Sequence, residues 1–453
     1  MSPRLVHYSD VENAHDDPER LARLAGTLNA LDGSDALVVG TGDNTGPGVL
    51  SLVTDGRQSL ELFDAVKPAF ETFGNHDFDH GVEAIGDIIE ESPQTWLTAN
   101  VREDGDRFAA AETEPWALRT VDGVRIGLVG VTTPDTEATS PGAAPLAVTD
   151  PVPAVADAVD ALEARGAEQV VVLSHLGRGD DELARRCDVD VILGGHVHER
   201  RVTRIDGTLL ARPESNGHTV VEVDLGGSKP TAAFRTVDGT DTVEASVARA
   251  IERRLDRSGL TETVAHVDEP ISRSRQATKG GESRIGNLVA DAYRWYTGAD
   301  IGLQNAGGVR TDETPLSGAV TVADLVSVVP FEEPVTVARV TGAELRRLCR
   351  QASGQVVDYG DSAWWHAHVS GLEVVWNRER RRVDRLTVGG EPVEDDRTYT
   401  LATTDYVLTS AMEFPVLTDA NRVEKTKLQY EVLADYARAV GIDPSVEGRV
   451  LRR

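Results

Sequence analysis

The sequence predicts an α/β fold that is divided between two domains. The chain has 453 residues, which is longer than one hydrophobic core usually supports. In the first half, short apolar runs typical of strands alternate with segments of helical periodicity. This alternation is typical of a sheet that helices cover on both faces. From about residue 262 a second unit of mixed helices and strands follows.

The first strand is expected at residues 5–9, and a helix follows it closely. Asp17, Pro18 and Glu19 supply an N-cap, a proline for the first turn and an acidic first turn. Leucines then recur at helical spacing from Leu21 to Leu31. Further strands are expected at 36–40, 71–73, 96–100, 125–131, 169–174 and 189–193, with closing strands at 207–225. Further helices are expected at 59–66, 81–91, 152–165 and 181–186.

A charged segment at 238–260 separates the two halves. Val243, Val247, Ile251 and Leu255 form one apolar stripe, which predicts a helix that connects the domains. The expected domains are therefore 1–237 and 261–453. In the second domain a helix is expected at 282–297, and strands are expected at 335–340, 372–375 and 398–403. The charge run at 378–382 is expected to be a solvated hairpin turn.

The charge of the chain is strongly acidic, with a formal net charge of −29. Only five of the 46 basic residues are lysine, which leaves 41 arginines. An acidic, lysine-poor surface is typical of a protein from a salt-rich cytoplasm, where salt screens self-repulsion. An acidic protein from an ordinary cytoplasm is the alternative. The same charge argues against a nucleic-acid partner, whose phosphates require a basic surface.

A cytoplasmic location without a membrane partner is expected. No apolar run approaches the roughly 20 residues that a membrane span needs. The residues after Met1 enter a strand without the charged and apolar leader of an export signal. Cys187 and Cys349 lie far apart and are expected to be reduced, buried thiols. The sequence gives no indication of the oligomeric state.

Possible metal ligands lie where the predicted strands of the first domain end. These ligands are Asp10, Glu12, Asp43, Asn75, His175, His196 and His198. Mixed nitrogen and oxygen ligands suit Mn, Zn, Co or Fe better than Ca or an all-oxygen Mg site. Two divalent metal ions about 3.5–4 Å apart form a clamp for displacement at phosphorus. The pattern therefore predicts two divalent metal ions and a phosphoester hydrolase.

With this order of motifs the chain resembles the calcineurin-like metallophosphoesterases, and more narrowly the 5′-nucleotidase/UDP-sugar hydrolase family. The resemblance covers nearly the whole chain. It implies a four-layer α/β/β/α metallophosphoesterase domain, followed by an α+β nucleotide-binding domain. It also implies one metal site formed by Asp10, Asp43 and His198. The residues that match the other site are Asp43, Asn75, His175 and His196, with Asp43 as the bridge.

The resemblance further implies that His76 is the catalytic histidine and that Asp79 orients it. A cationic His76 would stabilise negative charge at phosphorus or protonate the leaving alkoxide. Asp77, which lies between them, is expected to be structural. The chain departs from the family at Glu12, where the usual Asp-x-His motif has histidine. Glu12 can serve as an oxygen ligand in place of this histidine. Alternatively, water or a shifted neighbour fills the position, and His15 is a weaker candidate for that role.

The second domain carries motifs that resemble the nucleotide site of the family. Gln304–Arg310 resembles its N-x-G-G-I-R motif, and Phe331 and Tyr406 match its two base-stacking aromatic residues. The residues expected to bind substrate are Asn305, Gly308, Arg310, Phe331, Tyr406 and Lys279. Lys279 is the cation nearest to a position where many relatives have arginine and this chain has Gly281. Ala411-Met412-Glu413 replaces the Gly-Asp-Gly turn that holds the ribose, and Glu413 is a candidate for that role.

A second histidine pair, His366 and His368, could share one face of a strand. No carboxylate or cysteine accompanies the pair in the sequence, so a packing or surface role is expected rather than metal binding. The predicted function is metal-dependent hydrolysis of nucleoside 5′-monophosphates, with a small-molecule nucleotide as the partner. The same metal chemistry on a UDP-sugar, a 2′,3′-cyclic nucleotide or a nucleoside polyphosphate is the first alternative. A non-catalytic nucleotide-binding protein is the second.

Overall fold

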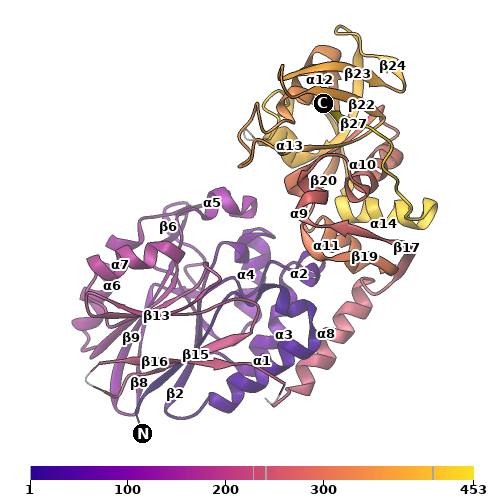
Figure 1. Ribbon diagram of the computed structural model, residues 1–453. Helices are drawn as coiled ribbons and strands as arrows, with labels where there is room; N and C mark the ends of the chain where they lie inside the picture. Colours follow the sequence, from indigo (N-terminus) through magenta and orange to yellow (C-terminus); the bar gives the residue numbers. More distant parts are fainter. Residues whose placement is uncertain (1, 228, 240–241, 411–412) are drawn as a thin grey trace. The chain divides into compact units, whose positions relative to one another are not determined.

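The chain forms two compact units, Met1–Ser258 and Gly259–Arg453, in the computed structural model (Figure 1). The structure describes residues 2–227, 229–239, 242–410 and 413–453. Within these ranges, no helix is long and apolar enough to cross a bilayer.

The first unit is built on two large sheets. The seven-stranded sheet has the order β16-β15-β1-β2-β3-β4-β7, and its strands from β1 to β7 are parallel. Its strands are β1 (Arg4–Tyr8), β2 (Ala36–Gly40), β3 (Phe70–Thr72), β4 (Thr95–Leu97), β7 (Thr113–Glu114), β15 (Thr219–Asp224) and β16 (Thr231–Thr236). The six-stranded sheet has the order β13-β14-β12-β11-β9-β8. Its strands are β8 (Trp116–Val121), β9 (Val124–Thr132), β11 (Gln169–His175), β12 (Val191–Gly194), β13 (Arg200–Ile205) and β14 (Thr208–Pro213).

The two sheets pack face to face. Leu5, Val39 and Phe70 from one sheet and Leu128 and Val171 from the other belong to one buried apolar cluster. A small third sheet contains β5 (Val101–Glu103), β6 (Asp106–Arg107) and β10 (Leu146–Val148).

Helices cover the outer faces of both sheets. On the side of the six-stranded sheet, α6 (Pro151–Glu163) and α7 (Asp180–Arg186) share a buried cluster with β11. On the other side, α1 (Pro18–Leu31), α3 (Leu60–Val66) and α8 (Ala245–Ser258) contact one another (Figure 1). The remaining helices are α2 (Val49–Thr54), α4 (Val82–Glu91) and α5 (Thr136–Thr139), with short 3-10 turns η1 (Glu12–Asp16), η2 (Arg57–Ser59), η3 (His76–Phe78), η4 (Pro141–Ala143) and η5 (Gly177–Gly179). The expected four-layer α/β/β/α domain is therefore confirmed.

The second unit is an α+β domain with two sheets and a separate strand pair. The five-stranded sheet has the order β21-β18-β25-β20-β26, the four-stranded sheet has the order β24-β23-β22-β27, and β17 pairs with β19. The strands are β17 (Thr263–Arg273), β18 (Ile301–Asn305), β19 (Asp312–Thr321), β20 (Pro334–Thr341), β21 (Ala367–Ser370), β22 (Leu372–Asn377), β23 (Arg382–Val388), β24 (Glu391–Pro392), β25 (Thr398–Thr404), β26 (Arg422–Leu428) and β27 (Val450–Arg452). The helices are α9 (Arg275–Lys279), α10 (Arg284–Thr297), α11 (Val322–Val328), α12 (Gly342–Gln351), α13 (Asp405–Thr409) and α14 (Gln429–Val440), with 3-10 turns η6 (Ala306–Gly308) and η7 (Asp419–Asn421).

Local sequence signals place most elements to within two or three residues. The predicted cap of α1 is present, since the Asp17 carboxylate accepts hydrogen bonds from the backbone N–H groups of Glu19 and Arg20. The charge run at 378–382 connects β22 to β23, as expected of a hairpin turn.

The helix expected at 238–260 is shorter than predicted, because α8 begins only at Ala245. Val247 and Ile251 of the apolar stripe are buried, whereas Val243 precedes the helix and is 40% exposed. The helix packs on α1 and α3 of the first unit. Its role as a connection between domains stays a prediction, as do the domain limits.

Candidate metal centre and substrate-binding residues

The predicted metal ligands follow strands whose carboxyl ends lie at one edge of each sheet. Asp10 follows β1, Asp43 follows β2, and Asn75 follows β3. His175 is the last residue of β11, and His196 and His198 follow the parallel neighbour β12. The carboxyl ends of parallel strands meet at the same edge, which is where open α/β sheets bind ligands. The fold therefore gathers side chains from distant positions of the chain.

The structure brings these ligands together in two groups. Asp43, His175 and His196 form one group, and Asp10, Glu12 and His198 form the other. In each group the candidate ligand atoms all lie within 4.8 Å of one another. The distance between Asp43 Oδ2 and His175 Nε2 is 3.0 Å, which joins the two sheets. The first group contains three of the four residues implied for one site, and the second contains Asp10 and His198 of the other site together with Glu12 but without Asp43.

Two further features fit a metal ion. Asn75 Oδ1 is buried and has no hydrogen-bond partner in the described structure, which is costly unless a ligand completes its environment. His175 Nδ1 lies 2.6 Å from the backbone carbonyl of Thr41, so Nδ1–H donates and Nε2 is the ring nitrogen that faces the site. The nitrogen and oxygen donors together suit a transition-metal ion.

Glu12 is buried among the candidate ligands, with an exposed fraction of 5%. Its Oε1 lies 2.9 Å from Nε2 of His198, and burial raises the pKa of its carboxyl. His15, the weaker candidate for this position, lies elsewhere. Its Nε2 is 2.9 Å from the backbone carbonyl of Asn44, and burial lowers its pKa to about 4. The geometry thus supports Glu12 rather than His15 as the substitute for the usual histidine.

His76 and Asp79 are in direct contact beside the metal groups. His76 Nδ1 lies 2.8 Å from Asp79 Oδ2, and Ser140 Oγ donates to the other Asp79 oxygen at 2.8 Å. Burial lowers the pKa of His76, but Asp79 and Asp43 outweigh burial and raise it to about 9. His76 is therefore a cationic imidazole at neutral pH, and Asp79 fixes its orientation.

Glycines allow the loops at this edge to approach closely. A Cβ at Gly74 would lie 2.1 Å from Oδ1 of Asp43, and one at Gly195 would lie 2.4 Å from Oγ of Ser9. Gly42 has φ +84°, and a Cβ there would lie 2.2 Å from the Gly74 nitrogen. Larger residues at these positions would displace the ligand-bearing loops.

Asp77 ties the β2 and β3 loops together, as its expected structural role requires. Its Oδ2 accepts from the backbone N–H groups of Asp43 and Gly74 at 2.9 and 2.7 Å. Its Oδ1 accepts from Asn44 and Thr45.

Sequence reasoning missed two buried ionisable features beneath the site, of which Glu71 in β3 is the first. Glu71 accepts hydrogen bonds from Tyr8 and from Asn44, and burial raises its pKa to about 8. Glu71 stands among apolar residues of a predicted strand, which could identify it as an unusual buried acid. Its hydrogen-bond partners, Tyr8 and Asn44, are distant in the sequence and could not be identified in this way.

The second missed feature is an ion pair between Asp180 and Arg212. The Nη2–Oδ2 distance is 2.7 Å, and both side chains are almost fully buried. Arg212 also donates to the carbonyl of Gly177 at 2.8 Å, and Ser174 Oγ donates to Asp180 at 2.6 Å. The pair therefore connects the segments that flank His175. No local sequence pattern predicts this ion pair.

The predicted substrate-binding residues of the second unit lie in three places. The Arg310 guanidinium lies over the Phe331 ring, with 5.2 Å from Cζ to the ring centroid. Tyr406 is 42% exposed, and its backbone N–H donates to Glu333, close to Phe331 in the chain. Lys279 instead lies over Trp364, at 4.4 Å from Nζ to the centroid.

Asn305 and Gly308 shape the turn that follows β18. Asn305 is buried, and its Oδ1 accepts from Gln304 at 2.9 Å. A Cβ at Gly308 would lie 1.9 Å from Nε2 of Gln304, so a larger residue here would displace the Gln304 side chain. Both residues therefore have a structural role in this turn, and their contact with substrate stays a prediction.

The second histidine pair has the packing role that was expected. His368 Nε2 lies 2.9 Å from the Thr278 carbonyl. His366 Nε2 lies 2.5 Å from Glu413 Oε2, and its ring stacks on Tyr359. Among the described residues, neither histidine joins a group of possible metal ligands. Glu413 itself is described, whereas Ala411 and Met412 of the predicted ribose turn lie outside the described residues.

Comparison with known proteins gives two family matches. Residues 3–200 match the calcineurin-like phosphoesterase family, and residues 263–419 match the 5′-nucleotidase C-terminal domain. The trifunctional nucleotide phosphoesterase protein YfkN of Bacillus subtilis is 25% identical over 87% of this chain, which spans 31% of YfkN. A 5′-nucleotidase of Rattus norvegicus is 24% identical, over 83% of this chain and 75% of that protein.

A solved structure shares the fold over the full length. The 5′-nucleotidase precursor from Thermus thermophilus has a TM-score of 0.73 and is 24% identical. The comparison covers 100% of this chain and 99% of that chain.

Proposed function

The chain belongs to the calcineurin-like phosphoesterases that carry a 5′-nucleotidase C-terminal domain, and we propose that it hydrolyses nucleoside 5′-monophosphates to nucleoside and phosphate. The observation that carries the proposal is the pair of ligand groups that meet beside His76. The predicted nucleotide-binding residues of the second unit support the choice of substrate. The family matches on both units agree with it.

Asp43, Asn75, His175 and His196 would hold one metal ion. Asp10, Glu12 and His198 would hold the other, with Asp43 as the bridge. Such a pair of divalent ions activates water and neutralises the charge of the phosphoryl group. Unpartnered Asn75 Oδ1 and the inward Nε2 of His175 support this assignment. The identity of the metal stays open among Mn, Zn, Co and Fe.

The side chains of the protein would supply a general acid, His76, and the residues that hold it in position. Asp79 accepts the Nδ1 proton of His76, which leaves Nε2–H free to donate to the phosphoryl group or to the leaving 5′-oxygen. Ser140 donates to Asp79 and holds the carboxylate in place. The backbone N–H of His76 donates to Asp43 Oδ1 at 2.7 Å, so the acid and the bridging ligand share one rigid turn.

Nucleoside recognition is assigned to the second unit. Phe331 and Tyr406 offer aromatic rings for base stacking, a contact worth about 1–3 kcal/mol per base in other proteins. Arg310, which lies over Phe331, supplies planar N–H donors that suit a phosphate. Lys279 and Glu413 complete the proposed set, with Glu413 as the group for the sugar hydroxyls.

The cellular setting is part of the proposal. The net charge of −29 and the shortage of lysine support a salt-rich cytoplasm. Nucleotide catabolism in that compartment fits the proposed reaction.

Phosphate release from AMP with Mn²⁺ in molar KCl tests the proposal. We expect release by the wild type and a loss of at least about 100-fold in kcat for His76→Ala, because the acid is removed. His266→Ala, which removes an exposed histidine of β17 in the second unit, is the control and should retain activity. If an aryl phosphate is cleaved through His76 while AMP is inert, the metal assignment stands and the nucleotide assignment is wrong. If neither is cleaved, the proposal is wrong and the alternative of a non-catalytic nucleotide-binding protein is favoured.

A further inference from the structure

The packing of His366 does not account for its contact with Glu413. His366 Nε2 lies 2.5 Å from Glu413 Oε2, and the two side chains are 5% and 13% exposed. Because a carboxylate can only accept, Nε2–H donates in this contact. Among the described residues, no side chain or backbone N–H donates to the other carboxylate oxygen, Oε1. The histidine therefore fixes the orientation of the carboxylate and leaves Oε1 for another donor.

The ring of His366 is itself held firmly. It stacks on the ring of Tyr359, with 3.8 Å between the centroids and 13° between the planes. The backbone N–H of His366 donates to the carbonyl of Ala352 at 2.6 Å, and its own carbonyl accepts from the N–H of Ala306 at 3.0 Å. The His366 side chain is therefore fixed beside the turn that follows β18.

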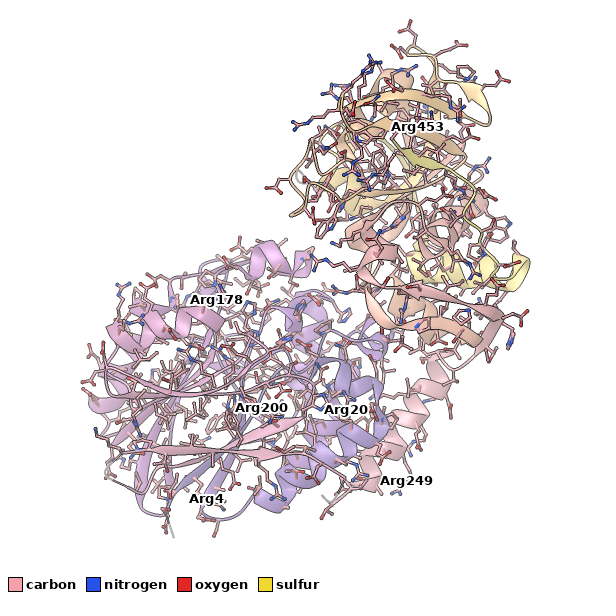
Figure 2. The ribbon with its side chains drawn as sticks, in the orientation of Figure 1. Arg4, Arg20, Arg178, Arg200, Arg249 and Arg453 are labelled. Carbon is pink, nitrogen blue, oxygen red and sulfur yellow. The ribbon has the colours of Figure 1, made fainter. Side chains whose placement is uncertain are left out.

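A small recess opens at Gly307 in this turn. Gly307 is exposed, so the recess is accessible to solvent. A Cβ at this glycine would lie 3.6 Å from Asn305 Nδ2, 3.7 Å from His366 Cε1 and 3.9 Å from Glu413 Oε1. We call the space bounded by these three side chains the Gly307 recess. It lies entirely within the second unit, whose side chains are drawn in Figure 2.

The polar atoms around the Gly307 recess favour a hydroxyl group. Asn305 Oδ1 already accepts from Gln304 at 2.9 Å, so the amide presents its Nδ2 donor to the recess. Glu413 Oε1 presents an acceptor. A hydroxyl oxygen accepts and donates at one atom, so a single hydroxyl can satisfy both groups. The carboxylate would repel a phosphate, and an apolar group would leave both side chains without a partner.

A further atom indicates that a polar ligand completes the recess. His366 Nδ1 is bonded directly to Cε1, the ring atom nearest to Gly307. It is buried and has no hydrogen-bond partner among the described residues. Buried polar atoms normally have a partner, and a polar ligand beside Cε1 would supply one.

We propose that His366 is a positioning residue for the sugar of the nucleotide. It orients Glu413, whose Oε1 accepts a hydrogen bond from a sugar hydroxyl in the Gly307 recess, and Asn305 donates to the same hydroxyl. The inference rests on the proposed function and deepens it, because it narrows the substrate to nucleotides that carry this hydroxyl. It also gives a physical means of holding the sugar in a chain that lacks the Gly-Asp-Gly turn.

Hydrolysis of AMP and of 2′,3′-dideoxy-AMP, with Mn²⁺ in molar KCl, tests the proposal. We expect KM of the wild type to be at least tenfold higher for the dideoxy substrate, with kcat changed less than threefold. A site built around a hydroxyl rejects the analogue without it, because its polar groups are then left unpaired. The 2′-deoxy and 3′-deoxy monophosphates identify which hydroxyl occupies the recess. Equal KM values for AMP and the dideoxy substrate would overturn the proposal.

Gly307→Ala blocks the recess with a single methyl group. The added Cβ meets the surrounding side chains at ordinary contact distances, so the turn should keep its structure. We expect KM for AMP to rise at least tenfold, while KM for the dideoxy substrate changes less than twofold. Gly86→Ala is the matched control, since a Cβ at this glycine of α4 has nothing within 4 Å, and it should change neither value.

Two substitutions of His366 separate positioning from packing. His366→Phe retains a ring against Tyr359 but removes the donor to Glu413, so KM for AMP should rise at least fivefold with little change for the dideoxy substrate. His366→Gln returns an N–H near the position of Nε2 and should restore the preference for AMP to within threefold of the wild type. His266→Phe, at an exposed histidine of β17, is the control. Equal losses for both substrates in Gly307→Ala and His366→Phe would overturn the proposal.

Nucleoside binding distinguishes failure of this inference from failure of the proposed function. Equilibrium dialysis measures the Kd values of adenosine and 2′,3′-dideoxyadenosine. If AMP is not cleaved, but adenosine binds at least tenfold more tightly and Gly307→Ala removes the difference, the recess is supported and the nucleotidase proposal is wrong. If AMP is cleaved without discrimination between the sugars, only the recess proposal is wrong. If there is neither cleavage nor preferential binding, both are wrong.

Discussion

Replacement of Arg212 by methionine should strongly destabilise the first unit. The Arg212 and Asp180 side chains are 1% and 0% exposed, and the ion pair between them is 2.7 Å long. Methionine fills a similar volume but leaves the Asp180 carboxylate buried without its counter-charge. It also removes the donor to the Gly177 carbonyl.

The magnitude follows from the burial of the pair. Breaking a buried ion pair by removing one partner costs about 3–5 kcal/mol, because an uncompensated charge remains. The free energy of unfolding should therefore fall by about 3–5 kcal/mol at pH 8. Burial already raises the pKa of Asp180, and loss of Arg212 removes the cation that opposes this rise. The deficit should shrink as the pH falls, because protonation of Asp180 removes the unpaired charge.

Denaturant unfolding of the full chain, followed by circular dichroism, measures the effect. The double variant Arg212→Met/Asp180→Asn should recover most of the loss, because no buried charge remains. Arg185→Met is the control, since Arg185 is exposed and its contact with Asp181 is 4.0 Å long. That variant should lose less than about 1 kcal/mol. A loss below about 1 kcal/mol in Arg212→Met, or a double variant no more stable than the single one, would refute the reasoning.

Four further predictions concern the site. As the pH rises from 5.5 to 8, the free energy of unfolding of Glu71→Gln should increase by about 3 kcal/mol relative to that of the wild type, measured by denaturant titration. The pKa of Glu71 is about 8 in the fold, so only the unfolded wild type ionises it in this range. Asp79→Asn should lower kcat about 10–100-fold with little change in KM, since the amide no longer fixes the acid. Glu12→Ala should reduce Mn²⁺ binding from two ions to one at equal total metal, measured by equilibrium dialysis; retention of both would exclude Glu12 as a ligand. Mn²⁺ binding should release protons at pH 7, seen by calorimetry in buffers of different ionisation enthalpy, because the pKa values of His175 and His198 are about 10 in the metal-free chain.

Much of the first unit could be predicted because its signals are local. A strand-like run that ends in glycine and a side chain able to ligate metal, such as Asp43, indicates a possible metal ligand at the end of a strand. The cap at Asp17 identifies the start of α1 in the same way. That Glu12 is an oxygen ligand stays a prediction, and it rests on the family resemblance, because Glu12 stands where the usual motif has histidine.

Contacts between sheets could not be predicted in this way. The approach of His175 to Asp43 depends on how two sheets pack, and nothing near either residue in the sequence encodes it. The same holds for Arg212 and Asp180, which join β14 to α7. Helix α8 begins later than its apolar stripe suggests, because burial against α1 and α3 decides which valines are covered.

The second unit illustrates a different limit. His366 was expected to pack, and it does so against Tyr359, but its contact with Glu413 spans residues that no motif connects. Lys279 was expected to bind substrate as the cation nearest to the position of a missing arginine, and the structure places it over Trp364 together with Arg275. A cation near an aromatic ring gains electrostatic attraction without a carboxylate partner, so its position depends on tertiary packing.

Hydrogen bonds between the loops oppose the backbone strain at the candidate metal centre. Asp10, Glu12, Asp43 and His196 all have φ between +44° and +71°, a conformation that costs about 1–2 kcal/mol per residue outside glycine. Backbone hydrogen bonds oppose this cost, since Asp10 N–H donates to Gly42 and Glu12 N–H donates to the Asp43 carbonyl. The loops are therefore held by the strand ends themselves.

The charges follow a similar logic. Three carboxylates, those of Asp10, Glu12 and Asp43, are buried within this edge, and their mutual repulsion requires positive charge. The contacts of His198 with Asp10 and Glu12 raise its pKa to about 10. Burial lowers the pKa of His175, but Asp43 outweighs burial and raises it to about 10. Protons on these two imidazoles thus offset two of the three carboxylate charges. Metal ions would take the place of these protons at the same atoms, so metal binding would exchange one source of positive charge for another.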